Sequence, residues 1–93
     1  MPEISISKTA SAGSVESSDC LVTVTPADSI EIDYSGANKK IFEKRTEAMT
    51  RAILAEYSVT AGRVHIQDQG AIEITLRARI ETAVERALEA RLP

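Results

Sequence analysis

The sequence predicts an α+β fold, a two-layer sandwich in which a small antiparallel sheet of three or four strands packs against two helices. Three observations support this prediction. Two runs of alternating apolar and polar residues come first, a long stretch with helical periodicity follows, and another alternating run precedes a second helical stretch. The 93 residues suffice for one modest core. We therefore expect a flexible N-terminal segment over residues 1–13 and a single domain over residues 14–93.

The first two strands are predicted after a lead-in that is rich in Ser, Ala and Gly and has no sustained periodicity. Residues 20–25 have a high β-branched content, which favours a strand. Residues 30–35 alternate cleanly between apolar and polar side chains, as expected for a half-buried strand. The Pro-Ala-Asp-Ser sequence at 26–29 supplies turn residues, so these two strands are predicted to form a hairpin.

The first helix is predicted from residue 39 to about residue 57, after a Gly-Ala-Asn break in which Asn38 is a plausible N-cap. Its apolar residues recur at helical spacing and form one stripe, which comprises Phe42, Met49, Ile53 and Tyr57. A Thr-Ala-Gly sequence then ends the helix.

A third strand is predicted at residues 63–68, and residues 68–71 (DQGA) are predicted to form a turn that leads into a helix. Residues 72–76 fit both a short fourth strand and the beginning of a helix, because their apolar residues suit either period. Residues 77–92 contain no Gly or Pro and many good helix formers, so a C-terminal helix is expected there.

Composition argues against several classes of function. The net charge is −3 and aromatic residues make up 3% of the chain, so binding to nucleic acid or to anionic membranes is not expected. The single cysteine, Cys20, cannot form an intrachain disulfide, which suits a reducing compartment. We find neither a signal-peptide pattern nor an apolar run of about 20 residues that would span a bilayer, and we expect a cytoplasmic protein.

Candidate catalytic or ligand-binding residues are few. His65 and Cys20 have no visible partner in the sequence, so an edge histidine and a buried structural thiol are the simpler interpretations, and no metal site is predicted. Arg77 and Arg79 could contact a phosphate or a partner, but their charges alternate with glutamates and also fit a solvated helix face.

The serine-rich segment at residues 12–19 (AGSVESSD) is the best candidate for a chemical role. A serine nucleophile needs a neighbouring base, and the segment has none. Two interpretations stay open on the residues alone. One is an inert linker, and the other is an acceptor for covalent modification by another enzyme, which would recognise the nearby acids Glu16 and Asp19.

The same segment resembles the N-terminal signature of the citrate lyase acyl carrier (gamma subunit) family. Three further stretches match that family in order and extend the resemblance over roughly residues 10 to 90: residues 24–26 (VTP), 64–71 (VHIQDQGA) and 76–87 (LRARIETAVERA). The resemblance implies that residues 14–93 form an acyl-carrier domain, which performs no bond chemistry itself.

In that family, the serine that follows the glutamate carries a 2′-(5″-phosphoribosyl)-3′-dephospho-CoA group, and this position corresponds to Ser17. Ser18 and Ser14 are the less favoured attachment positions. The resemblance further implies that the thiol of the arm bears acetyl and citryl thioesters. Its implied partners are the alpha (CoA-transferase) and beta (citryl lyase) subunits, and a prosthetic-group transferase that modifies the serine.

The sequence also allows three alternative functions. The first is the carrier subunit of malonate decarboxylase, a similar family with the same kind of arm. The second is an unmodified protein-interaction module, which the alternating sheet and the mixed-charge helices would also allow. The third is a small enzyme that uses His65 or Cys20, and it has the least support.

Overall fold

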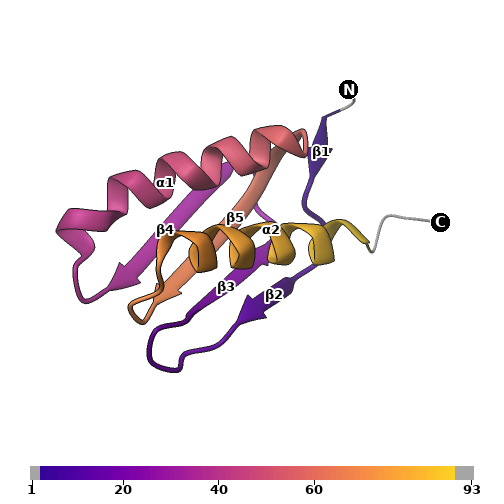
Figure 1. Cartoon of the computed structure of the whole chain (residues 1–93). Helices are drawn as coiled ribbons and strands as arrows, with labels where there is room; N and C mark the ends of the chain where they lie inside the picture. The colour runs from indigo at the N-terminus through magenta and orange to yellow at the C-terminus, as the bar shows by residue number, and fades with distance from the viewer. Residues whose placement is uncertain (1–2, 90–93) are drawn as a thin grey trace.

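The computed structural model describes residues 3–89, which form an open five-stranded sheet with two helices against one of its faces (Figure 1). The α+β class predicted from the sequence is confirmed. Residues 1–2 of the expected lead-in and residues 90–93 at the expected C-terminal helix lie outside the described residues. The elements follow in the order β1 (Ile4–Ser5), β2 (Ala10–Gly13), β3 (Cys20–Thr25), β4 (Ile30–Gly36), α1 (Lys39–Glu56), β5 (Val59–Asp68) and α2 (Glu73–Glu89).

The sheet is mixed, and the prediction of an antiparallel sheet with a β3–β4 hairpin is wrong. β5 lies between β3 and β4, antiparallel to the first and parallel to the second. β2 pairs antiparallel with β3, and β1 pairs parallel with the first residues of β5. The reason is that β4, α1 and β5 form a β–α–β unit, in which the helix supplies the long crossover that parallel neighbours need.

The N-terminal segment contains two strands where the sequence analysis expected no regular structure. β1 and β2 fall within residues 4–13, and the Ile6 and Ala12 side chains are buried in the core. β1 has only two residues and β2 consists of Ala, Ser and Gly, so neither strand gives a sustained alternation of large apolar and polar side chains. Residues of this segment therefore contribute to the sheet.

The core lies between the sheet and the two helices. Alternate residues of β3, beginning with Cys20, face the helices and are fully buried, which is the period-two pattern of a half-covered sheet. α1 follows the predicted bounds closely, and its buried face also includes two threonines, of which Thr50 donates its hydroxyl to the carbonyl of Thr46 at 2.8 Å. Asn38 occupies the N-cap position without a side-chain capping hydrogen bond.

Residues 72–76 belong to the helical end of the chain. α2 begins at Glu73, and the amide of Leu76 donates to the carbonyl of Ile72 at 3.0 Å. The strand alternative for these residues is therefore excluded. Within the described residues, the structure holds no helix that is both long and apolar enough to cross a membrane.

Candidate functional site

The serine loop, residues 14–19, joins β2 to β3 and packs against the connection between β5 and α2. The amide of Ser18 donates to the carbonyl of Gln69 at 2.8 Å, and the amide of Gln69 donates to the carbonyl of Asp19 at 2.8 Å. Figure 1 shows that this loop, the β5–α2 connection and the beginning of α1 lie at the same end of the molecule. Two segments about fifty residues apart in sequence are thus held together by backbone hydrogen bonds.

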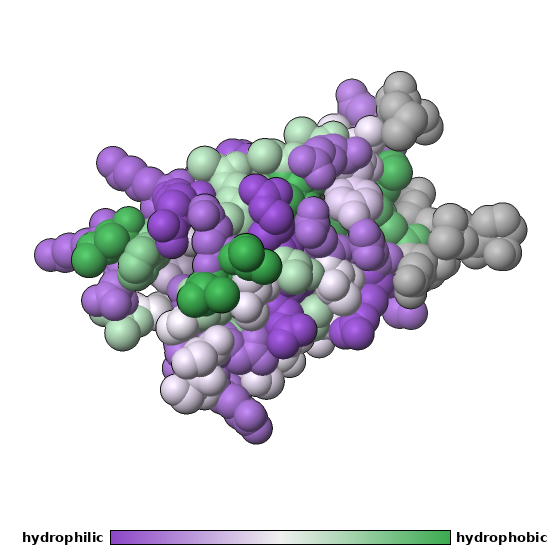
Figure 2. Space-filling view, in the orientation of Figure 1, coloured by the Kyte–Doolittle hydropathy of each residue, from purple (hydrophilic) through white to green (hydrophobic). Residues whose placement is uncertain are grey.

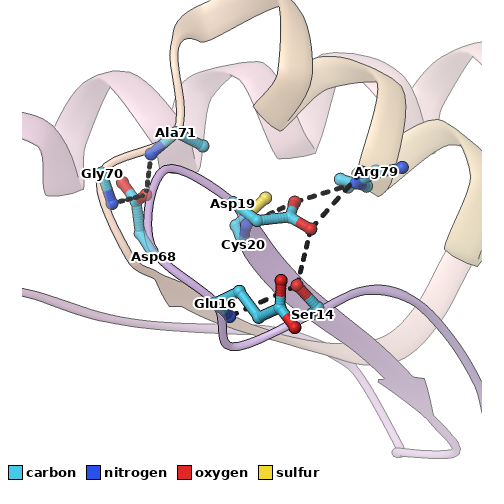
Figure 3. Close-up of polar contacts among 8 residues, drawn as sticks. All are labelled: Ser14, Glu16, Asp19, Cys20, Asp68, Gly70, Ala71 and Arg79. Atoms are coloured by element: carbon cyan, nitrogen blue, oxygen red, sulfur yellow. Dashed lines mark hydrogen bonds and ion pairs between the residues drawn. The ribbon is translucent and has the colours of Figure 1, made fainter.

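The Asp19 carboxylate ties the serine loop to α2 (Figure 3). One oxygen, Oδ2, accepts a hydrogen bond from the Ser14 hydroxyl at 2.8 Å, and Oδ1 accepts one from the Cys20 amide at 2.7 Å. Arg79 donates from Nε to Oδ1 at 3.0 Å and from Nη2 to Oδ2 at 3.4 Å. Chiefly because of the hydrogen bond from Arg79, the pKa of Asp19 is lowered from its ordinary 3.8 to about 2. Asp19 is therefore ionised and bound on both oxygens near neutral pH.

The three serines of the loop differ in their surroundings. Ser14 is half-buried, and its hydroxyl donates to Asp19 and accepts from the amide of Glu16 at 3.3 Å. Ser17 and Ser18 are exposed, and within residues 3–89 neither side chain has a hydrogen-bond partner. The Ser18 backbone has φ 67° and is bonded to Gln69, whereas Ser17 has neither constraint. An incoming group would therefore reach Ser17 or Ser18 without breaking an existing contact, but not Ser14.

A glycine determines how tightly the loop closes. Gly13 has φ +95°, and a Cβ added there would lie 1.9 Å from the carbonyl oxygen of Cys20. The close approach places the Ser14 amide 3.1 Å from that same oxygen, where it donates a hydrogen bond. Only glycine combines this conformation with this approach at no steric cost. The serine loop is thus a defined turn.

The β5–α2 connection is organised by Asp68, which the sequence analysis placed in the predicted turn but did not single out. Its side chain is buried, and Oδ1 accepts hydrogen bonds from the amides of Gly70 at 3.0 Å and Ala71 at 2.9 Å (Figure 3). Its Oδ2 accepts from the Tyr34 hydroxyl at 2.6 Å. Burial and this hydrogen bond raise the pKa of Tyr34, so the phenol stays protonated as a donor. The DQGA sequence, with an Asp two residues before a Gly, was the available signal.

The other candidate residues lie elsewhere. Cys20 is fully buried, and burial raises the pKa of its thiol to about 11, so it is not poised as a nucleophile. His65 is paired across the sheet between Thr23 and Asp33, away from the serine loop. Arg77 is exposed, whereas the neighbouring Arg79 is bound to Asp19. Among the described residues, there is no cluster of three or more His, Cys, Asp or Glu side chains that could hold a metal ion.

Comparison with known proteins identifies the family. A family model described as "Malonate decarboxylase delta subunit (MdcD)" matches residues 7–87. The citrate lyase acyl carrier protein of Haemophilus influenzae (strain PittEE) is 42% identical over 84 residues, which cover 90% of this chain and 88% of that relative. The citrate lyase acyl carrier protein of Lactococcus lactis is 40% identical over 87 residues, or 92% of this chain and 91% of the relative. This chain belongs to the citrate lyase acyl carrier protein family.

A solved structure supports the fold of this family member. A chain in the crystal structure of a Pseudomonas malonate decarboxylase hetero-tetramer in complex with malonate superimposes with a TM-score of 0.70 at 21% sequence identity. The match covers 91% of this chain and 89% of that chain. The curated relatives confirm the family predicted from the serine segment and the ordered downstream motifs, and the likeness to the malonate decarboxylase chain shows that the two share a fold.

Proposed function

We propose that this chain is the acyl carrier subunit of a citrate lyase and that Ser17 carries a covalently attached 2′-(5″-phosphoribosyl)-3′-dephospho-CoA arm. The observation that supports this most directly is the exposed Ser17 hydroxyl, which lies on a loop whose shape is fixed by the bonds of Asp19 to Ser14 and Arg79. An accessible oxygen without an internal partner fits a phosphodiester linkage. When bound, the arm supplies the thiol that bears acetyl and citryl thioesters.

The residues around Ser17 have two separate roles in this proposal. Glu16 is exposed, so its carboxylate is available to the prosthetic-group transferase. The Asp19 carboxylate is bound by Arg79 and Ser14, so it contributes to recognition by fixing the shape of the loop that the transferase binds. Ser18 is the second choice for attachment, because it is equally exposed but has a more constrained backbone.

The carrier itself performs no bond chemistry in this proposal. Its partners are the alpha (CoA-transferase) and beta (citryl lyase) subunits, which act in turn on the tethered thioester in the cleavage of citrate to oxaloacetate and acetate. A short flexible tether gives an effective concentration that reaches the millimolar range, which makes each transfer step intramolecular. We propose a cytoplasmic location, consistent with the single buried thiol.

The second candidate is the carrier subunit of a malonate decarboxylase. The match to the family model and the similar fold of a chain in the Pseudomonas hetero-tetramer favour it. The identity of 40–42% with citrate lyase carriers, against 21% with that chain, favours the citrate enzyme.

The test is co-expression with a citrate lyase prosthetic-group transferase, followed by intact mass measurement and fragmentation. We expect the mass of one phosphoribosyl-dephospho-CoA group on Ser17, its loss in Ser17→Ala, and its retention in the matched control Ser18→Ala. An adduct on Ser18 would keep the carrier role and reject the attachment site. A chain that stays unmodified, under conditions in which a known citrate lyase carrier is loaded, would reject the proposal.

A second assay separates the two enzymes. The loaded carrier is mixed with citrate lyase alpha and beta subunits or with the corresponding malonate decarboxylase subunits. Citrate cleavage in the first mixture alone is expected, and malonate decarboxylation in the second alone would favour the other candidate.

A further inference from the structure

A groove of about 430 Å³ lies between the beginning of α1 and the beginning of α2. On one side it is lined by the N-cap residue Asn38 and by Phe42 and Arg45 of α1, and on the other side by Ile72 and Glu73. Figure 2 shows apolar side chains at the surface over this end of the molecule, where Ile72 is 68% exposed. A concave site of this size that is lined by aromatic and aliphatic side chains together with a few polar groups is typical of a small-molecule site.

The groove is close to the serine loop. Gly70 forms part of its wall, and the preceding residue, Gln69, accepts the hydrogen bond from the Ser18 amide at 2.8 Å. Bond lengths along this path limit the separation of the Ser17 and Gly70 Cα atoms to at most about 12 Å. A group attached at Ser17 therefore starts within reach of the groove.

The lining of the groove suits an adenine nucleotide. The Arg45 guanidinium lies over the Phe42 ring, 4.8 Å from its centroid, which makes a flat, cationic platform on which a base can stack. Arg45 forms no salt bridge within the described residues, so its donors are available to a phosphate. Asn38 makes no capping bond, and a free amide side chain can pair with the amino and N7 groups of adenine.

The two acidic residues that line the groove, Asp68 and Glu73, differ in how they would affect the binding of a nucleotide. Asp68 is buried, and its oxygens are already bonded to the Tyr34 hydroxyl and to two backbone amides. Glu73 is exposed at the first residue of α2, where its carboxylate can accept a hydrogen bond from an exocyclic amine. Arg45 is the basic residue among those that line the groove, and its guanidinium can bind a phosphate.

We propose that this groove binds the adenosine diphosphate portion of the arm that Ser17 carries. The inference rests on the proposed function for the source of the nucleotide. In a phosphoribosyl-dephospho-CoA group, the phosphoribosyl unit links the protein to the adenosine, so the nucleotide is the part nearest the anchor and the thiol end is the part farthest away. Holding the nucleotide restrains the arm near its anchor and leaves the thiol end free for the partner enzymes.

The test uses the unmodified full chain and two-dimensional ¹⁵N NMR. Dephospho-CoA, ADP and pantetheine are titrated separately to about 10 mM, a concentration of the order that a short tether provides. We expect dephospho-CoA and ADP to give saturable shifts at the amides of residues 37–45 and 70–73, and pantetheine to give none there. Arg45→Gln and Asn38→Ala should each weaken the binding about tenfold.

Arg51→Gln is the matched control, because Arg51 is an exposed arginine of α1 that pairs with Glu47 outside the groove. Equal affinity for ADP in Arg45→Gln and Arg51→Gln, or no saturable shift at these amides up to about 10 mM, would overturn the inference.

The same spectra are then recorded on the loaded chain. We expect its groove amides to be shifted in the direction that ADP produces, and groove amides unchanged by loading would also overturn the inference. Because the titrations need no modified serine, they are independent of the loading experiment. A chain that binds ADP in the groove but is never loaded at Ser17 would reject the proposed function and assign the groove to a free adenine nucleotide.

Discussion

Arg79 holds Asp19 from a position sixty residues away in sequence, and this contact connects the serine loop to a helix of the core. The ion pair sits at 40% and 19% side-chain exposure, so it is a partly shielded contact rather than an isolated surface pair. Because Asp19 in turn binds the Ser14 hydroxyl and the Cys20 amide, one arginine organises both ends of the serine loop. Arg79 therefore helps to fix the conformation of the loop that contains Ser17.

The ion pair predicts a shift in the titration of Asp19. In the native chain, the carboxylate carbon of Asp19 should titrate with a midpoint near 2, and Arg79→Gln should move the midpoint toward 3.8. Arg77→Gln is the matched control, since Arg77 is the exposed arginine two residues earlier. The measurement is an NMR pH titration, and the same midpoint in native chain and Arg79→Gln would contradict the assignment.

The same pair sets a pH window for stability. The folded pKa of Asp19 lies below its ordinary value, so the contact stabilises the fold above pH 3.8 and is lost as the pH falls toward 2. The difference in the free energy of unfolding between the native chain and Arg79→Gln should therefore be constant above about pH 5 and shrink below pH 4. Urea titrations at several pH values measure this difference.

The buried hydrogen bond between Tyr34 and Asp68 should also stabilise the fold. Tyr34→Phe removes the donor and leaves Oδ2 of Asp68 buried without it, so the free energy of unfolding should fall by about 1–3 kcal/mol. Tyr57→Phe is the control, because Tyr57 donates to Glu85 at the surface, and its effect should stay within about 0.5 kcal/mol. Chemical denaturation measures both, and equal losses would contradict the prediction.

Among the elements, the sequence predicts which segments are strands better than which strands pair. The alternation in residues 20–25 and 30–35 is a local property, and the structure has strands at both places. The pairing depends on β5, whose apolar and small residues let it lie between the two. A hairpin is the simplest local interpretation of the 26–29 turn, but the helix between β4 and β5 permits the parallel arrangement instead.

In the candidate site too, features formed by residues adjacent in sequence can be predicted, whereas contacts between residues far apart in sequence cannot. The accessible serines and the DQGA turn are local features, and both were visible in the sequence. The bond between Asp19 and Arg79 was not, because the alternating charges around Arg79 equally fit a solvated helix face. The sequence does not predict the groove either, because Phe42 fits the apolar stripe of a helix and Ile72 lies in a stretch that suits both a strand and a helix.

Gly13 and Gly70 lie in turns and have the same φ angle, but replacing each with alanine should lower the free energy of unfolding by different amounts. Gly13 and Gly70 both have φ +95°, but an added Cβ meets the Cys20 carbonyl at 1.9 Å in the first and nothing within 4 Å in the second. Gly70→Ala should cost about 1–2 kcal/mol from backbone strain alone. Gly13→Ala should cost clearly more, because the serine loop must move. Thermal and chemical unfolding compare the two, and a larger cost at Gly70 would contradict the structure.

The two ends of the molecule differ in what they contain. The serine loop, the β5–α2 connection and the beginning of α1 share one end, while β1 and the end of α2 lie at the other (Figure 1). Under the proposed function, a partner enzyme would approach the serine end while the sheet and its pairing stay intact. Ile66, close to the end of β5 that leads into the β5–α2 connection, is fully buried and anchors this end to the core.

Residues of the N-terminal segment are part of the core of the molecule. Ile6 is 3% exposed, and its side chain lies so close to β5 that a Cβ added at Gly62 would be 2.6 Å from its Cγ1. If residues 1–13 were only a flexible segment, shortening this side chain would have no effect on stability. We expect instead that Ile6→Ala lowers the free energy of unfolding by about 2–5 kcal/mol, the range for a buried aliphatic side chain.

Val15→Ala is the matched control for Ile6→Ala. Val15 is another β-branched apolar residue near the N-terminus, but it is 57% exposed in the serine loop, so its truncation should change stability by no more than about 0.5 kcal/mol. Urea unfolding of the two variants and the native chain makes the comparison. Similar small effects in both variants would contradict the prediction. They would mean that Ile6 is not stably buried and that the segment is a flexible lead-in.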